Sequence, residues 1–271
     1  MILWLDPSAG PHFPATRAAL EEPAGLLAAG GCLSVEWLLL AYRHGIFPWF
    51  NEGEPILWWS PAPRTVLYPH SFHTSRSLAR LHRQQRYQIS VNQDFAAVIR
   101  ACACDRPGQR GTWINSQMVD AYIDMHRAGY AHSIECRDGD KLVGGLYGIA
   151  LGRVFFGESM FSGVANASKL CLKHLAECGD YEIIDCQMAT DHLRSLGAEQ
   201  LERSEFEAAL QRWAETPDAP EMDFVHLIVR TATGRELPAR VRVQRRSGLQ
   251  IAQGVALWHV QKKSPRSRRS P

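Results

Sequence analysis

The sequence predicts an α+β fold with a mixed sheet, and two stretches of the chain carry this prediction. In the first, strand-like runs at 132–137 and 141–150 flank the dipeptide Asp138-Gly139. An Asp-Gly pair in this position is a strong hairpin signal, so these strands should pair antiparallel. In the second, residues 154–187 have the pattern of strand, loop, helix and strand. That order favours parallel strands joined by a crossover, so both kinds of pairing are expected in one sheet.

The strand–helix–strand unit is defined by local signals. Residues 154–157 are aromatic and β-branched, which indicates a buried strand, and a second strand is expected at 181–186. Between them, Asn166 or Ser168 is expected to cap a helix that Gly179 ends. Open α/β sheets hold ligands at the C-terminal ends of such strands, so this unit is the first place to look for a site.

The remaining elements follow from caps and apolar spacing. Strands are expected at 65–68 and 87–91, whereas residues 1–33, rich in Pro, Gly and Ala, are expected to be extended or loop structure. Further helices are expected after the caps Ser34, Ser75 and Asn115, over 94–104, and after a capping box of Ser204 with Glu207.

The chain is expected to divide into three parts. Pro61-Ala-Pro63 separates a small N-terminal domain, 1–62, from a larger domain, 63–215. Periodicity is lost from Thr216, so residues 216–271 are predicted to be a largely disordered basic tail, in which 249–260 alone has the pattern of a hairpin.

Positive charge is concentrated in that tail. The last 51 residues hold 11 Lys and Arg against 3 Asp and Glu, while the whole chain holds 30 against 28. The first 220 residues therefore hold 19 against 25 and are mildly acidic. Overall charge is thus poor evidence for a nucleic-acid partner, and any such evidence must be local.

Several protein classes are excluded by composition. No apolar run approaches the roughly 18 residues of a membrane helix, and the N-terminus lacks the pattern of a signal peptide. Seven cysteines without regular spacing indicate reduced thiols, so a cytoplasmic protein without a membrane partner is expected. Cys102 and Cys104 lack a second pair at ligand spacing, which favours buried helix thiols over a metal site.

Three polar side chains are predicted to gather at one edge of the sheet. Because side chains alternate along a strand, Asp185 and Gln187 should share one face, and Cys186 should turn away into the core. Glu158 ends the neighbouring strand and could join the same cluster. The alternative is structural: Asp185 caps the next helix and Gln187 is solvated.

Aromatic residues and glycines mark candidate contact surfaces. Residues 47–59 contain three Trp and two Phe in segments broken by Pro and Gly. Such rings are mostly core, but loops bounded by Pro lie at the surface, where Trp49 could line a site. Gly144-Gly145, inside a predicted strand, indicates a bulge or a ligand close to the backbone.

Four arginines form a candidate phosphate-binding stripe. Arg76, Arg80 and Arg83 have helical spacing, with Arg86 just beyond, and no acidic residue lies among them. The stripe is either a solvated helix face or a surface for phosphate groups.

Ten motifs, in order along residues 12–214, resemble the leucyl/phenylalanyl-tRNA–protein transferase family. Among them are Tyr-Arg-His-Gly-Ile-Phe-Pro-Trp-Phe (42–50), Phe-Gly-Glu-Ser-Met-Phe-Ser (156–162) and Ile-Asp-Cys-Gln (184–187). The others lie at 22–31, 57–61, 111–114, 132–135, 144–148, 166–169 and 195–198. The tail beyond about 220 resembles nothing in the family, and Gly163 stands where a larger residue is usual.

The resemblance implies a small N-terminal domain and a C-terminal domain of the acetyltransferase-like (GNAT) fold. It implies transfer of Leu, Phe or Met from aminoacyl-tRNA to a protein that begins with Arg or Lys, which marks that protein for degradation, without cofactor or metal. Asp185 and Gln187 would act in catalysis, and Arg76, Arg80, Arg83 and Arg86 would meet the tRNA acceptor stem. The residues that would hold the aminoacyl-adenosine and its side chain are Tyr42, Trp49, Trp113, Leu146, Phe155, Glu158 and Met160.

The chemistry of such a transfer suits these residues. The aminoacyl ester is already activated, so positioning a neutral amine and stabilising the oxyanion matter most. Asp185 would accept a hydrogen bond from the amine, while Gln187 would either orient the amine or donate to the carbonyl oxygen. Glu158 with Asp185 would attract a basic N-terminal residue. Leu, Phe and Met are unbranched at Cβ, which suits a pocket of Phe and Met side chains.

Two other functions remain alternatives. A CoA-dependent acetyltransferase of the same fold would need a Gly-rich loop for pyrophosphate, but residues 163–168 contain one glycine. A non-catalytic RNA-binding module would use the arginines and tryptophans but would leave Asp185, Gln187 and Glu158 unexplained.

Overall fold

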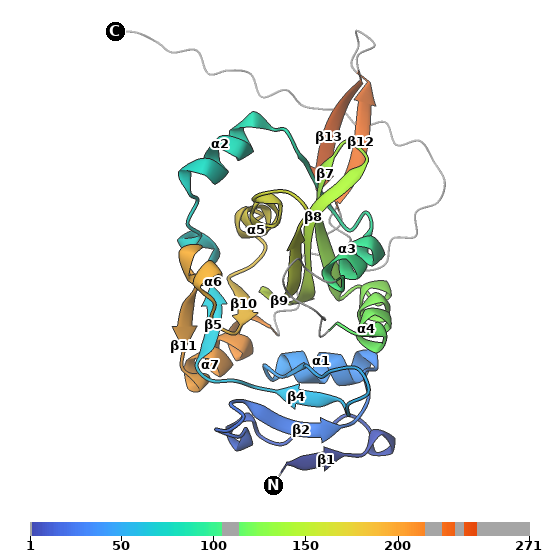
Figure 1. Ribbon diagram of the computed structural model, residues 1–271, viewed down its shortest axis with the longest axis vertical. Coiled ribbons are helices and arrows are strands. Elements are labelled where there is room, and N and C mark those ends of the chain that lie inside the picture. Colours follow the sequence, from blue (N-terminus) through green and yellow to red (C-terminus); the bar gives the residue numbers. More distant parts are fainter. Residues whose placement is uncertain (1, 105–113, 215–223, 231–235, 243–271) are drawn as a thin grey trace. The chain divides into compact units, whose positions relative to one another are not determined.

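The computed structural model describes residues 2–104, 114–214, 224–230 and 236–242. The chain falls into two compact units, Met1–Phe224 and Val225–Pro271. The first unit contains two sheets and the helices labelled in Figure 1. In the tail, β12 (Phe224–Arg230) and β13 (Glu236–Arg242) form a two-stranded sheet.

A four-stranded sheet is formed by the N-terminal segment, in the order β1-β2-β4-β3. Its strands are β1 (Leu3–Leu5), β2 (Leu26–Gly30), β3 (Phe47–Pro48) and β4 (Leu57–Trp59). Here β1 and β2 run parallel, and the remaining pairs are antiparallel. Helix α1 (Val35–Arg43) lies between this sheet and helix α4 in Figure 1. The division between domains at residue 62 stays a prediction.

A seven-stranded mixed sheet in the order β11-β5-β10-β9-β8-β7-β6 forms the larger part of the unit. Its parallel pair is β9 with β10, and the other neighbours are antiparallel. The α+β class with a mixed sheet is therefore confirmed. The strands are β5 (Arg64–Leu67), β6 (Gln88–Val91), β7 (Ala131–Asp138), β8 (Lys141–Leu151), β9 (Val154–Ser162), β10 (Ile183–Gln187) and β11 (Glu199–Leu201).

Helices cover both faces of this sheet. Helix α5 (Ala167–Glu177) packs on one face of β7 and β8, while α3 (Phe95–Cys102) and α4 (Ser116–Arg127) pack on the other (Figure 1). The remaining helices are α2 (Arg76–Gln84), α6 (Asp191–Ser195) and α7 (Arg203–Trp213).

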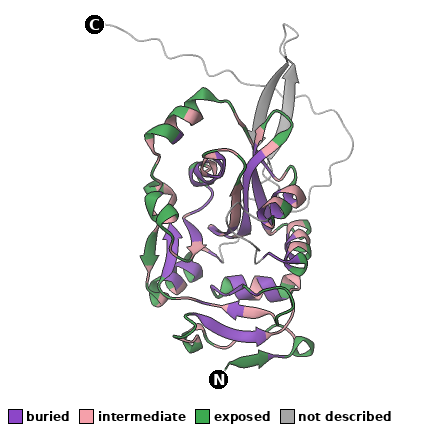
Figure 2. Ribbon diagram, viewed as in Figure 1, coloured by how far each residue is buried: buried purple, intermediate pink, exposed green. Residues whose placement is uncertain are grey.

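The core has one cluster of buried side chains on each face of the larger sheet. The cluster on the α5 side includes Phe155, Leu175 and Ile184. The cluster on the other side runs without interruption from Leu5 in β1 to Leu210 in α7, so the two sheets share it. Figure 2 shows the buried residues concentrated on the strands and on the inner faces of the helices.

Most predicted elements are confirmed, because their caps act as expected. The side chains of Ser34, Ser75 and Asn115 each accept a backbone N–H three residues on, at the start of α1, α2 and α4. The hairpin at Asp138-Gly139 and the parallel pairing of β9 with β10 are also confirmed.

Other expectations are wrong. Residues 1–33 contain β1 and β2; Ala and Gly favour strands weakly, and pairing with β1 and β4 fixes β2 instead. The capping box of α7 is formed by Glu202 with Glu205, not by Ser204 with Glu207. At the start of α5, Asn166 is left-handed and makes no side-chain cap. The strands at 224–242 were not predicted, and the expected hairpin at 249–260 lies outside the described residues.

A β-bulge lies at Val143, directly before Gly144-Gly145, as one of the two expectations has it, and α5 closely approaches the backbone at Gly144. A Cβ added to Gly144 would lie 2.4 Å from the Cβ of Ala167, at the start of α5. Glycine thus lets α5 sit directly on β8. This contact brings α5 against the strands that form the pocket described next.

Gly144→Ala should lower the free energy of unfolding by about 1–3 kcal/mol, because the added methyl group overpacks the contact with α5. Adding Ala167→Gly removes the opposing methyl and should recover part of that loss, although glycine is itself unfavourable in a helix. Urea unfolding of the two single variants and the double variant measures the coupling. Strictly additive effects would show that the two positions do not touch.

Candidate active site

A pocket of about 130 Å³ opens between β8, β9, β10 and α5. One wall is apolar and the other carries polar groups. The lining side chains relevant to function are Leu146, Phe155, Met160, Leu172, Leu175 and Ile184 on the apolar wall, with Tyr147, Glu158, Cys186 and Gln187 on the polar one.

The pocket exists because β9 and β10 separate. They pair over three residues, 183–185 with 154–156, although β9 continues to Ser162 and β10 to Gln187. Beyond the last pair the two strands diverge, and side chains from each line the space between them. This is the C-terminal edge of a parallel pair, where the sequence placed the site.

Both strands carry a β-bulge at the point of divergence. Gly157 and Ser159 pair with consecutive residues of β8, which leaves Glu158 as the extra residue. Asp185 and Gln187 pair with consecutive residues of β5, which leaves Cys186 as the extra residue. A bulge redirects the side chains around it, so both strands turn polar groups toward one point.

Glu158 is the centre of this polar group. It is 7% exposed; its Oε1 accepts Gln187 Nε2 at 2.8 Å and its Oε2 accepts the hydroxyl of Tyr122 at 2.8 Å. Tyr122 is in turn hydrogen-bonded to the hydroxyl of Tyr42. Burial raises the pKa of Glu158 to about 7, against the lowering effect of the hydroxyls of Tyr42 and Tyr122. This carboxyl group therefore exchanges its proton near neutral pH.

A third tyrosine approaches the same carboxyl group. The hydroxyl of Tyr147 is buried and has no hydrogen-bond partner among the described residues. Burial and the charge of Glu158 together raise the pKa of Tyr147 well above its usual value. The hydroxyl is thus a neutral group with an unused hydrogen bond at the pocket wall.

Asp185 has a different environment. It is fully buried and bound by Arg64, with Nε to Oδ1 at 2.8 Å and Nη2 to Oδ2 at 2.6 Å. Its Oδ1 also accepts the backbone N–H of Gln187 at 2.9 Å. Gln187 has φ of 62°, a left-handed conformation that is unfavourable by roughly 1–2 kcal/mol for a residue other than glycine.

The expected side-by-side projection of Asp185 and Gln187 is therefore wrong. Gln187 lines the pocket, but Asp185 does not; it points to Arg64, and the two residues meet through the backbone of Gln187. The bulge breaks the alternation on which the expectation rested. Cys186 keeps the direction expected of it: like Ile184 it lies on the side of the core cluster under α5, and both residues line the pocket from there. Burial raises the pKa of the Cys186 thiol, so it is no nucleophile.

Tyr42, Trp49 and Trp113 are the other aromatic residues expected at the site, and their outcomes differ. Tyr42 joins the site through Tyr122. Trp49 is 38% exposed, lies 5.4 Å from the ring of Trp59 and is not in the pocket lining. Trp113 lies outside the described residues.

The arginine stripe is shorter than expected. Arg76, Arg80 and Arg83 are exposed on α2 and form no ion pair with any residue that the structure describes. Arg86 follows the left-handed residue that ends this helix and pairs with Asp138 at 3.3 Å. The acidic partner comes from the β7–β8 hairpin, which is distant in sequence.

Sequence reasoning did not assign a site role to Arg64, Tyr122 or Tyr147. Tyr122 looked like an apolar position of a helix, and Tyr147 lay in a motif with no stated role. A signal for Arg64 was present, because a charged residue that starts an otherwise apolar buried strand needs a partner.

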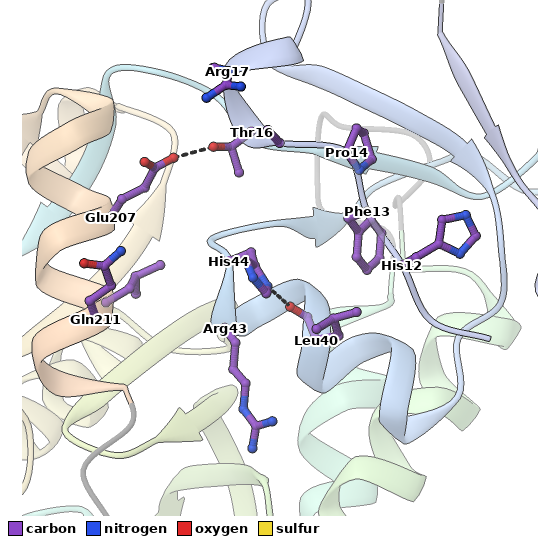
Figure 3. Close-up of a pocket in the computed structure, with 12 residues that line it drawn as sticks. His12, Phe13, Pro14, Thr16, Arg17, Leu40, Arg43, His44, Glu207 and Gln211 are labelled. Atoms are coloured by element: carbon purple, nitrogen blue, oxygen red, sulfur yellow. Dashed lines mark hydrogen bonds between the residues drawn. The ribbon is translucent and has the colours of Figure 1, made fainter. Parts of the chain in front are cut away.

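A larger cavity of about 670 Å³ lies elsewhere, between residues 12–17, the end of α1 and α7 (Figure 3). Thr16 donates a hydrogen bond to Glu207 across it, and His44 Nδ1 is 2.8 Å from the oxygen of Leu40. Volume alone would favour this cavity. Nevertheless, the buried carboxyl group with a raised pKa and the unpartnered hydroxyl belong to the smaller pocket, which we take as the site.

The described residues offer neither a metal site nor a membrane-spanning helix. In the part of the chain that the structure describes, no three His, Cys, Asp or Glu side chains lie together in a way that could hold a metal ion. No described helix has the length and apolar character needed to span a bilayer.

Two family models match this chain. The family model for leucyl/phenylalanyl-tRNA protein transferase matches residues 66–211, and the model for the N-terminal domain of this family matches residues 31–62. A GCN5-related N-acetyltransferase structure from Kribbella flavida is 12% identical, with a TM-score of 0.33, and covers 59% of this chain and 58% of that one.

Three relatives are leucyl/phenylalanyl-tRNA–protein transferases from Pseudomonas. The protein of P. fluorescens Pf0-1 is 55% identical over 80% of this chain and 97% of its own length. That of P. putida W619 is 55% identical over 81% and 98%, and that of P. aeruginosa LESB58 is 52% identical over 83% and 100%. The chain belongs to the leucyl/phenylalanyl-tRNA–protein transferase family.

Proposed function

We propose that this protein transfers Leu, Phe or Met from aminoacyl-tRNA to the N-terminal Arg or Lys of an acceptor protein in the cytoplasm, marking it for degradation. The observation that carries the proposal is the hydrogen bond between Gln187 and Glu158 at the mouth of an apolar pocket. Family membership gives the class of reaction.

The apolar wall is the place for the transferred side chain. Leu146, Phe155 and Met160 line it together with leucines of α5. Methionine adapts to ligands of different shape, so Leu, Phe and Met can share one pocket. Their unbranched Cβ carbons pass the narrow space between diverging strands more easily than those of Val or Ile.

Gln187 orients the amine in this scheme. One of the two N–H groups of Nε2 donates to Glu158, and the carbonyl Oε1 on the other side of the amide can accept a hydrogen bond from the acceptor amine. Orientation of the amine is the role we assign, although the second N–H of Nε2 can still donate to the ester carbonyl, the other role open from sequence.

Glu158 receives the proton. The amine nitrogen attacks the ester carbonyl carbon and loses a proton to Glu158. The bond to the 3′ oxygen of the terminal adenosine then breaks as Glu158 returns this proton to that oxygen, which leaves as a hydroxyl, and an amide bond remains. A carboxyl group with a pKa of about 7 is well matched to an α-amine with a pKa near 7.7–8.0. Asp185 contributes by fixing Gln187, since it is paired with Arg64 and does not line the pocket.

The tRNA contacts are assigned to exposed residues. Arg76, Arg80 and Arg83, exposed on α2, would contact acceptor-stem phosphates, and the exposed Trp49 would offer a ring for the terminal adenosine; the same role for Trp113 rests on the family resemblance alone. The Arg86 side chain is paired with Asp138 and is left out of this surface.

A transfer assay tests the proposal against both alternatives. Purified protein is mixed with labelled Phe-tRNA and a peptide that begins with Arg; label should move to the peptide without any added cofactor. The same peptide with an acetylated N-terminus is the matched control and should stay unlabelled. Transfer from acetyl-CoA instead, or tRNA binding without transfer, would reject the proposal.

Arg76→Glu with Arg80→Glu should raise KM for Phe-tRNA at low salt and leave kcat nearly unchanged. Each lost phosphate contact should reduce the slope of log affinity against log salt by about 1. Arg127→Glu, at an exposed arginine of α4, is the control for charge reversal away from α2. A salt slope equal in both variants would remove α2 from the tRNA surface.

Glu158→Gln should lower kcat at every pH and reduce the acid limb of the rate from two titrating groups, Glu158 and the acceptor amine, to the amine alone, because the amide side chain cannot take the proton. In the wild type the rate should fall as pH falls through about 7, since the carboxyl group is then protonated. The pH dependence of single-turnover transfer measures this. An unchanged acid limb in the variant would assign the proton to another group.

The same variant should change the pH dependence of stability. Because the pKa of Glu158 in the folded protein lies above its ordinary value of 4.5, wild-type stability should fall as pH rises from about 4.5 to 7. Glu158→Gln should gain on the wild type by on the order of 3 kcal/mol across this window. Glu199→Gln, at an exposed carboxyl group, should give no such gain.

A further inference from the structure

Arg64 holds the buried carboxylate beside the active site from one side. Arg64 and Asp185 are 1% and 0% exposed and share two hydrogen bonds. The guanidinium carbon lies 4.8 Å from the ring centre of Phe47 and 4.9 Å from that of Phe206. The ring contacts come from β3 and α7, so the N-terminal sheet and the last helix of the unit both fix this arginine.

Asp185 transmits this constraint to the pocket. Its Oδ1 accepts Arg64 Nε and, at 2.9 Å, the backbone N–H of Gln187. That bond holds the left-handed conformation of Gln187, with φ of 62°. In this conformation the side-chain amide of Gln187 reaches Glu158 at 2.8 Å across the gap between the strands.

We propose that Arg64 is a positioning residue for the transfer reaction. It fixes Asp185 as a charged, oriented acceptor, and Asp185 in turn fixes the backbone of Gln187 and the aim of its amide. The inference rests on the proposed function for the reaction itself. It goes beyond that function because it adds Arg64, which does not line the pocket, to the residues on which transfer depends.

The pH profile of the reaction gives this idea a distinct signature. Glu158 is faced by Tyr42 from α1, Tyr122 from α4 and Tyr147 from β8, by Gln187 and Asp185 from β10, and by Arg64 from β5. Loss of Arg64 leaves the charge of Asp185 near Glu158 without its counter-ion. Glu158 then keeps its proton to higher pH, so the acid limb of the rate should move upward.

Arg64→Met tests the positioning role. Because Gln187 loses its fixed orientation, kcat should fall about tenfold to a hundredfold, while KM for Phe-tRNA changes by less than about threefold. The acid limb should move to higher pH. Arg153→Met, which breaks the partly exposed pair of Arg153 with Glu182, is the matched control and should retain kcat and the acid limb. An unaltered kcat in Arg64→Met would overturn the proposal.

Two double variants without charge at positions 64 and 185 separate two contributions of Asp185, namely its hydrogen-bond acceptor for the Gln187 N–H and its negative charge. They also leave no unpaired buried ion, which matters if Arg64→Met alone folds poorly. Arg64→Met/Asp185→Asn retains an oxygen that can accept the N–H of Gln187, whereas Arg64→Met/Asp185→Leu has none. The first should exceed the second in kcat by about tenfold. Equal rates would show that this acceptor is irrelevant to transfer.

Hydrogen exchange gives a readout that does not depend on activity. The backbone amide of Gln187 should be protected in the wild type and in Arg64→Met/Asp185→Asn, and should exchange faster in Arg64→Met/Asp185→Leu. Equal protection in all three would overturn the inference even if transfer is seen. Absence of transfer in the wild type with the expected protection pattern would instead refute the proposed function.

Discussion

The separation of β9 from β10 after three paired residues is the constraint on which the site depends. Two parallel strands that stop pairing expose backbone groups and leave a space that must be bounded by something else. Here α5 and apolar residues of β8 and β9 bound this space on one side. On the other, the hydrogen bond between Gln187 and Glu158 crosses the gap where a ladder hydrogen bond would otherwise lie.

Three buried carboxyl groups in the larger sheet are stabilised in three ways. Asp185 is paired with Arg64. Glu135 in β7 accepts the hydroxyls of Ser90 and Ser133 and the backbone N–H of Asp94, all neutral donors from nearby residues. Glu158 has tyrosine and glutamine donors and forms no ion pair with a residue that the structure describes, so burial favours its protonated form. Of the three, Glu158 alone lines the pocket.

Local signals predicted most of the fold, since caps such as Ser34 and Asn115 and the Asp-Gly turn act within a few residues. The residues of the pocket were also predicted, because Glu158 and Gln187 lie at the ends of a recognisable parallel pair. The sequence could not reveal the two bulges, which depend on pairing with β5 and β8 and give Asp185 and Gln187 different directions. It could not reveal Arg64 as the partner of Asp185, because that contact joins residues 121 positions apart. The buried strand β2 was missed because Ala and Gly carry no strand signal of their own.

The cluster of buried side chains shared by both sheets has a practical meaning for solution work. Trp37 and Trp58 belong to it, at 2% and 0% exposure, alongside Tyr147 and Phe156 from the strands around the pocket. A protein with one continuous core of this kind unfolds in one cooperative step. The change in the fluorescence of Trp37 in α1 and Trp58 in β4 therefore also reports the unfolding of the seven-stranded sheet. Any aminoacyl-nucleoside that occupies the pocket would delay that melting, and the native tryptophans would register it without an attached dye.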